Sequence, residues 1–202
     1  MHPDGRFSWE DRGAMLAFIA ERGFSTLFVH GAAGGFVFHV PVIVQDEESL
    51  RFHVARRNRG ADALDGARVW LSCTDGDFYV SPDWYGSADQ VPTWNYVAVE
   101  AEGLVRRLDD AALTDQVDRL SDAHERRLLP KAPWTRHKMT PGRFEAMTKA
   151  IIGFELRIEA LRGTRKLGQN KKAEERDGAI AALEAIGRAD AAALMRGEGA
   201  PE

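Results

Sequence analysis

Three short stretches of this sequence concentrate residues that could hold a flat, polar ligand. Residues 91–96 read Val-Pro-Thr-Trp-Asn-Tyr, and residues 81–85 just before them read Ser-Pro-Asp-Trp-Tyr. The third stretch, Lys-Leu-Gly-Gln-Asn at 166–170, adds an ammonium group and two amides. Aromatic rings offer flat walls, and hydroxyl and amide groups hydrogen-bond to the edge of a heterocycle. The alternative is that aromatic residues after a loop simply belong to the core.

The densest basic cluster is Arg56-Arg57-Asn58-Arg59. It follows a run typical of a strand and precedes a short helix expected at 61–64. Guanidinium groups and the unpaired backbone amides of a helix start both suit a phosphate. A solvated charged surface is the alternative interpretation of the same residues.

The motifs resemble the signature of the PaiB family, the FMN-binding negative transcriptional regulators. They are Pro-Thr-Trp-Asn-Tyr at 92–96, Ser-Pro-x-Trp-Tyr at 81–85 and Lys-Leu-x-Gln-Asn at 166–170, and the resemblance runs from about Phe7 to Leu183. The family is related to the pyridoxamine-phosphate-oxidase-like split barrels. The resemblance implies FMN as the cofactor and a homodimer with FMN in clefts at the subunit interface.

Chemistry and resemblance together assign cofactor-binding roles, while no catalytic residue is identified. His53 to Arg56, followed by Asn58, match the family pattern, which makes Arg56 the first phosphate candidate. The resemblance also places His39 and His53 near the site. Two residues depart from the family pattern. Arg165 stands where a tryptophan is common, which bears on the shape of the outer pocket. Gly168 stands where the family usually has serine, which bears on one hydroxyl contact. The expected groups are Arg56 and Lys166 for the phosphate, Thr93, Asn95, Gln169 and Asn170 for the pyrimidine edge, and Trp94 and Tyr96 for the ring faces.

Several functions are compatible with these residues. The family implies a negative transcriptional regulator acting in a flavin-linked way, although no helix-turn-helix with a basic recognition helix is visible. The alternatives are an FMN-dependent oxidoreductase acting on a small molecule and a haem-binding split barrel. A metal site is not expected, because His39 and His53 fall short of the three or four ligands of zinc. A hydrolase is disfavoured because the Gly-x-Ser-x-Gly elbow is missing.

The composition of the chain limits the kinds of partner that it is expected to bind. The chain has 202 residues, a formal net charge of −4 and a pI near 5.9. An acidic balance argues against a large DNA-binding surface, so DNA is a weakly supported partner. Cys73 is the only cysteine, the amino end lacks the apolar run of a secretion signal, and no stretch approaches a membrane span. We expect a cytoplasmic protein with no membrane contact.

The helices and strands that must position these residues are predicted from the spacing of apolar residues along the chain. Ser8 with Asp11 predicts a capping box before a helix, Asp110 opens a second helix, and Thr140-Pro141 opens a third. Pro41 lacks a backbone donor, so its strand is expected at an edge or a bulge. A terminal helix is expected at 171–187, and strands at 24–29, 36–44, 50–54, 69–72, 77–81, 95–107 and 152–158.

The first six of these strands follow one another at hairpin spacing and predict a small antiparallel barrel, to which 152–158 would return. The predicted class is therefore α+β: a split antiparallel β-barrel of the FMN-binding split-barrel type, with flanking helices and a C-terminal helical extension. We expect a single domain at residues 1–187 and a helical or frayed tail at 188–202.

Overall fold

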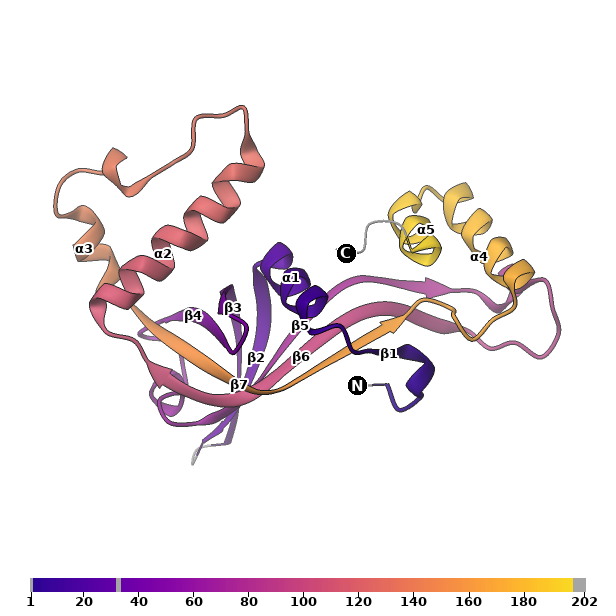
Figure 1. Cartoon of the computed structure of the whole chain (residues 1–202), viewed down its shortest axis with the longest axis horizontal. Coiled ribbons are helices and arrows are strands. Elements are labelled where there is room, and N and C mark those ends of the chain that lie inside the picture. Colours follow the sequence, from indigo (N-terminus) through magenta and orange to yellow (C-terminus); the bar gives the residue numbers. More distant parts are fainter. Residues whose placement is uncertain (1, 32–33, 198–202) are drawn as a thin grey trace. The chain divides into compact units, whose positions relative to one another are not determined.

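Antiparallel strands form the framework of the computed structural model, which describes residues 2–31 and 34–197 (Figure 1). In this part of the chain one sheet has the strand order β1-β7-β4-β3-β2-β5-β6, and β7 pairs again with β6. The second pairing of β7 closes the sheet into a barrel, which confirms the expected split-barrel fold with flanking helices. The strands are β1 (Ser8–Trp9), β2 (Phe24–Gly31), β3 (Gly34–Asp46), β4 (Ser49–Ala55), β5 (Arg68–Val80), β6 (Thr93–Arg107) and β7 (Ile151–Lys166).

The chain divides into two compact units. Unit 1 comprises residues 1–18, 74–100 and 162–202, and unit 2 comprises residues 19–73 and 101–161. Strands β5, β6 and β7 each contribute residues to both units.

Alternating residues of the strands build the core of unit 2. Phe38 and Val40 of β3 are buried, whereas His39 between them is exposed. Phe52 and Phe154 stack in this core, with ring centroids 5.6 Å apart. The period-two burial confirms the strand predicted at 36–44 and the assignment of its two faces.

The expectation that Pro41 places β3 at a sheet edge is wrong, because β3 lies between β2 and β4. Pro41 is opposite Phe24 of β2, and pairing with β4 begins only at the next residue, where Val42 faces Phe52. The missing N–H of the proline therefore falls just before the second ladder begins. An interior strand tolerates the proline at this position because no ladder bond is lost there.

Strand β5 is continuous from Arg68 to Val80, whereas the sequence predicts two strands separated by a polar break. The polar break at Thr74-Asp75-Gly76 stays part of β5, and Gly76 takes a φ of +61° that glycine readily adopts. In unit 1, a Cβ atom on Gly76 would lie 2.3 Å from the Leu194 side chain, so the helix that carries Leu194 packs directly on this part of the strand.

The helices begin close to the predicted positions, with two corrections. Helix α1 is capped by Asp11, whose carboxylate accepts from the Ala14 N–H at 2.9 Å, while Ser8 lies in β1, before the helix. Helix α3 begins after Gly142 rather than at Thr140-Pro141. The α-helices are α1 (Arg12–Arg22), α2 (Asp110–Glu125), α3 (Arg143–Thr148), α4 (Ala173–Ala185) and α5 (Ala189–Arg196), and the 3-10 helices are η1 (Gly5–Phe7), η2 (Ala61–Ala63), η3 (Pro82–Tyr85), η4 (Arg126–Leu128) and η5 (Arg136–Lys138).

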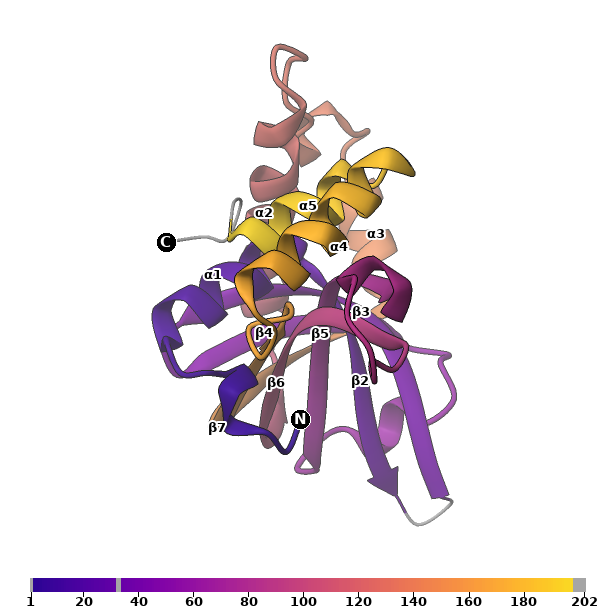
Figure 2. The ribbon, with the colours of Figure 1, turned by 90° about the vertical axis from the view of Figure 1, so that its right-hand side faces the viewer.

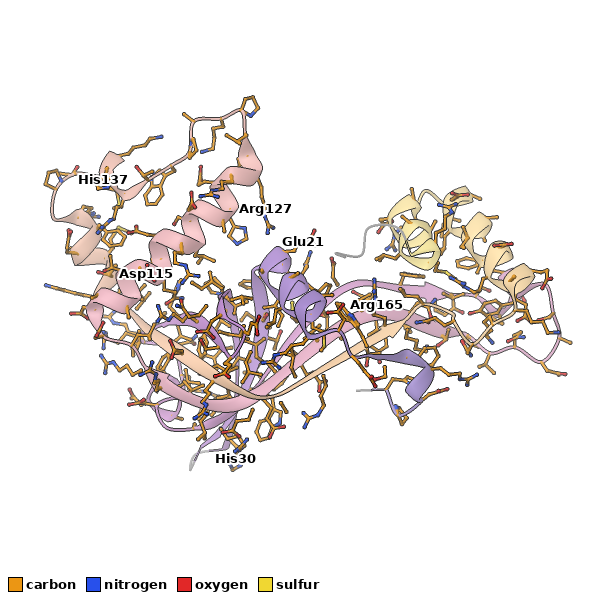
Figure 3. All side chains as sticks on the ribbon, in the orientation of Figure 1. Glu21, His30, Asp115, Arg127, His137 and Arg165 are labelled. Carbon is orange, nitrogen blue, oxygen red and sulfur yellow. The ribbon has the colours of Figure 1, made fainter. Side chains whose placement is uncertain are left out.

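Helix α2 packs on the barrel strands of unit 2. Gly153 permits the close approach, since a Cβ atom there would lie 2.9 Å from Leu113 and 3.3 Å from the amide oxygen of Gln116. The segment after α2 is tied to α1 by Arg127, which donates to the backbone carbonyls of Glu21 and Ala20 (Figure 3).

Helices α4 and α5 lie side by side in unit 1 (Figure 2). Ala191, Ala192 and Met195 of α5 are buried, and residues 198–202 of the expected tail lie outside the described residues. Among the residues that the structure describes, no helix is long and apolar enough to span a membrane.

Candidate functional site

The predicted site residues divide between the two units. His39, His53, Arg56 and Asn58 belong to unit 2, and the residues at 93–96 and 166–170 belong to unit 1. The convergence of Arg56 and Lys166 on one cofactor therefore stays a prediction.

Unit 1 brings Lys166 together with Thr93 and Trp94. Lys166 stands at the end of β7, and its ammonium group donates to the Thr93 hydroxyl and to the Trp94 backbone carbonyl. Burial lowers the pKa of Lys166, and the neighbouring charge of Lys171 lowers this pKa further. Lys166 is thus a positioned donor that releases a proton more readily than an ordinary lysine.

Trp94 presents its ring to solvent next to a second aromatic residue. Trp94 is 56% exposed and Tyr79 is 46% exposed, and their rings meet edge to face with centroids 6.3 Å apart. Isolated exposed aromatics are ordinary, but a contacting pair beside a held ammonium group offers a surface for a flat ligand. Tyr79 was not predicted as a site residue, although the alternation of 77–81 was the signal for its outward position.

Asn95 points away from the Trp94 ring. Successive strand residues face opposite sides, and Asn95 is only 1% exposed whereas Trp94 is largely exposed. The Asn95 side-chain nitrogen finds no hydrogen-bond partner in the described part of the chain. Tyr96, on the same strand, is half-buried. A buried amide donor left unpaired is uncommon and marks this position for a role beyond packing.

The late motif is partly engaged in its own turn. The Gln169 amide accepts from the Leu167 N–H at 2.7 Å and donates to the Arg165 carbonyl. Gln169 thereby shapes the turn after β7. Both Gln169 and Asn170 are exposed, so they differ in their hydrogen bonding within the turn and not in their access to solvent.

In unit 2 the two histidines have different partners. His39 is exposed on β3, and its Nδ1 lies 3.3 Å from the Thr26 hydroxyl. His53 is half-buried, and its Nδ1 lies 3.2 Å from the amide nitrogen of Gln116 on α2. Burial lowers the pKa of His53. Gln116 is fully buried and was missed by sequence reasoning, because its partner comes from a distant strand.

Arg56 is held by the backbone at the start of β7. Its Nε donates to the Lys149 carbonyl at 2.9 Å, and its Nη2 donates to the Ile151 carbonyl at 3.2 Å. Asn58 is exposed, and its N–H donates to the Ala55 carbonyl at 2.9 Å. The guanidinium of Arg57 makes no ion pair or hydrogen bond within residues 2–31 and 34–197, so it is available to an external anion.

One face of the unit 2 sheet is apolar and exposed. Phe28 of β2 faces Val37 of β3 and Trp70 of β5, and Phe24 faces Pro41 farther along. We call Phe24, Phe28, Val37 and Trp70 the apolar sheet face. Their exposed fractions lie between 42% and 56%. An exposed apolar row of this kind is typical of an interaction surface.

These donors fit the chemistry of FMN. A flavin requires cations or amides for its phosphate, polar groups for the pyrimidine edge and flat walls for the ring. Taken separately, unit 2 contains the arginine-rich loop at 56–59 as a phosphate candidate, and unit 1 contains the Lys166 cluster as an edge donor and the exposed Trp94–Tyr79 pair as a flat wall.

The fold and these residues define a flavin-binding split barrel. The chain belongs to the family described as "Putative FMN-binding domain", whose sequence model matches residues 1–160. This match confirms the PaiB-type resemblance and FMN as the cofactor. The matched region contains the loop at 56–59 and the motif at 92–96, and it ends before Lys166.

Relatives of known sequence agree with this membership. The "Protease synthase and sporulation protein PAI 2" of Bacillus subtilis is 26% identical over 158 residues, covering 76% of this chain and 75% of that protein. An uncharacterized protein of Aspergillus fumigatus is 33% identical over 175 residues, covering 69% of this chain and 67% of that protein.

Solved structures share the fold. A flavocytochrome from Azotobacter vinelandii is 15% identical with a TM-score of 0.63, over 83% of this chain and 73% of that chain. An FAD and heme binding protein from Mycobacterium smegmatis is 18% identical with a TM-score of 0.60, over 85% of this chain and 79% of that chain. At these identities the likeness concerns the fold alone.

Proposed function

We propose that this chain is a homodimer that binds FMN at the subunit interface and acts as a flavin-linked negative regulator of transcription. The apolar sheet face is the observation that carries the dimer. Phe28, Val37 and Trp70 form a contiguous row across three strands, and a second copy of the chain would remove this row from water. The regulatory role is supported by membership in a PaiB-type family.

Substitution of the face tests the dimer. Trp70→Glu should yield a monomer in sedimentation, because a carboxylate would have to be desolvated in the interface. Leu104→Glu is a matched control, since Leu104 is 46% exposed on β6 and lies outside the apolar sheet face. If the interface completes the site, dilution of the wild-type protein should weaken FMN affinity in step with dissociation. A stable monomer with full FMN affinity would reject the proposal.

When bound, FMN supplies the capacity for electron transfer, and the chain supplies binding and orientation. We assign the phosphate to the loop at 56–59. Because the Arg56 guanidinium already binds two backbone carbonyls, we propose that Arg56 holds the loop and that Arg57 and Asn58 meet the phosphate. Lys166 is assigned to the ring edge or to a bound substrate.

Paired titrations of FMN and riboflavin test this assignment, since riboflavin lacks the phosphate. Arg57→Ala should weaken FMN by about tenfold and riboflavin little, because it removes a charge-assisted contact. Lys166→Ala should affect FMN and riboflavin equally, because neither role assigned to Lys166 involves the phosphate. Selective loss of FMN in Arg56→Ala, with none in Arg57→Ala, would return the phosphate contact to Arg56.

Regulation by direct reading of DNA through α4 and α5 is not supported. These helices are joined by a short turn, but α5 contains a single basic residue and its buried side includes Ala191, Ala192 and Met195. A recognition helix needs polar and basic side chains that reach base edges. We expect DNA binding to be weak and strongly salt-dependent. Nanomolar, sequence-selective binding at physiological salt would contradict this expectation.

An FMN-dependent oxidoreductase is the second candidate, favoured by the exposed Trp94–Tyr79 pair beside the Lys166 ammonium group, a surface suited to contact with a small flat substrate. Titration with NADH and NADPH without air decides between the two functions. Bleaching of the flavin bands followed by reoxidation with substrate would favour the enzyme. The same spectrum separates flavin from haem, because haem gives one intense Soret band.

A further inference from the structure

Unit 2 contains a cationic cavity that shares only Arg56 with the residues assigned to FMN. The cavity has a volume of about 420 Å³ and lies among α2, α3 and the ends of β4 and β6. Four cationic side chains line it, from Arg56, Arg107, Arg136 and Lys149, against the two acids Asp110 and Glu145. The lining therefore has a formal excess of two positive charges in a chain whose net charge is −4.

Two of the cations are fixed in place. Arg56 is anchored on the carbonyls of Lys149 and Ile151. Arg136 pairs with Asp118 at 3.1 Å and stacks over the Phe144 ring at 5.2 Å from the centroid. Neither guanidinium has to be ordered when a ligand arrives, which reduces the entropic cost of binding.

The other two cations are unpaired as far as the structure describes the chain. Arg107 and Lys149 are exposed, and in the described part of the chain the side chain of neither makes an ion pair or hydrogen bond. Like charges gathered around one cavity repel each other, and an anion between them removes this repulsion. A phosphate monoester carries between one and two negative charges at neutral pH, so it can pair with both Arg107 and Lys149.

The cavity also has an apolar wall. Phe144 and Leu113, both at most 9% exposed, line it. A cavity of this size suits a small organic molecule rather than a bare ion. The ring of such a molecule would pack on Phe144, while its phosphate met Arg107 and Lys149.

We propose that this cavity is a binding site for a phosphate monoester that carries an aromatic ring, separate from the FMN site. The separate site rests on the assignment of the FMN phosphate to Arg57 and Asn58, because Arg56 belongs both to that loop and to the cavity. The other lining residues come from α2, η5, the α3 segment and the end of β6. A ligand at this position would contact both α3 and the ends of the barrel strands. Its binding would be a second signal to which the protein can respond, besides FMN.

Calorimetric titration of the FMN-saturated protein with phenyl phosphate tests the site. We expect saturable binding with one site per chain that tightens as salt is lowered. Phenol should bind far more weakly, since it lacks the charge, and inorganic phosphate should bind more weakly because it cannot contact Phe144. Arg107→Gln and Lys149→Gln should each weaken phenyl phosphate by about tenfold. Glu145→Gln should strengthen it, because it removes a like charge from the wall.

Arg143→Gln is the matched control, since Arg143 is an exposed cation of α3 that does not line the cavity. Retained binding in this variant, with losses at Arg107 and Lys149, supports the site. Absence of phenyl phosphate binding to the wild type, or equal losses in all three variants, overturns it. Competition between FMN and phenyl phosphate would also overturn the separate site. The visible flavin spectrum, recorded in every sample, shows independently whether FMN remains bound.

Discussion

Replacing Gly103 by alanine should disrupt the pairing of β6 with β7 that closes the barrel. A Cβ atom on Gly103 would lie 1.8 Å from the Arg157 carbonyl oxygen and 3.2 Å from the Glu159 nitrogen, although Cβ atoms in proteins essentially never lie within 3.0 Å of a heavy atom from a non-neighbouring residue. The strands would have to separate by more than 1 Å, because backbone atoms cannot rotate away as a flexible side chain can.

Overpacking typically costs about 1 to 3 kcal/mol, and the backbone obstacle places Gly103→Ala at or above the upper end. For a chain of this length, about 3 kcal/mol corresponds to a melting temperature lower by roughly 6 to 12 °C. Urea unfolding followed by tryptophan fluorescence measures the free energy, and a thermal scan measures the shift.

Gly35→Ala is the matched control. Gly35 also lies in a strand, opposite His30 of β2, and no atom lies within 4 Å of the position that its Cβ would take. This variant should be neutral or more stable by up to about 1 kcal/mol, because alanine loses less conformational freedom on folding. Equal stability of the two variants would refute the close approach of β6 to β7.

Two further predictions concern buried charge in unit 2. Burial lowers the pKa of His53, so the unfolded state binds a proton more readily than the folded state does. The contribution of His53 to the free energy of unfolding should therefore be fully present above about pH 6.5 and should decrease as the pH falls below this value. Between about pH 7.5 and 5.5, His53→Gln should lose less unfolding free energy than the wild type, as measured by urea unfolding. An unchanged pH dependence would contradict the burial of His53 as its cause. Glu155 is 12% exposed and pairs with Arg51 at 2.8 Å and Arg106 at 2.6 Å. Burial alone would raise its pKa, but these guanidinium hydrogen bonds lower it overall, so its stabilisation is present above the ordinary carboxyl pKa and is lost as the pH falls. Glu155→Gln should cost about 2 kcal/mol at pH 7.5 and progressively less toward pH 4; a constant difference across this range would count against the ion pairs.

The sequence was sufficient for the local features and for the family. The alternation from Phe36 to Val44 predicted both faces of β3, because side chains of a strand alternate whatever lies beside it. The motif at 92–96 indicated a flavin-binding split barrel, and the family match and the fold confirm it. The aromatic and amide residues of that motif also predicted a contact surface, although they did not reveal that Trp94 and Asn95 face opposite sides.

The tertiary structure decided which distant residues meet. The polar break at 74–76 appeared to end a strand, yet Leu194 packs against Gly76 and the strand continues. Arg56 was the expected phosphate ligand, but two carbonyls near the start of β7 hold its guanidinium. Only folding shows that Arg107 and Lys149 line one cavity, because residues this far apart carry no shared periodicity. Local patterns depend on neighbours in the chain, whereas partners and cavities depend on strand pairing, which single-sequence periodicity does not encode.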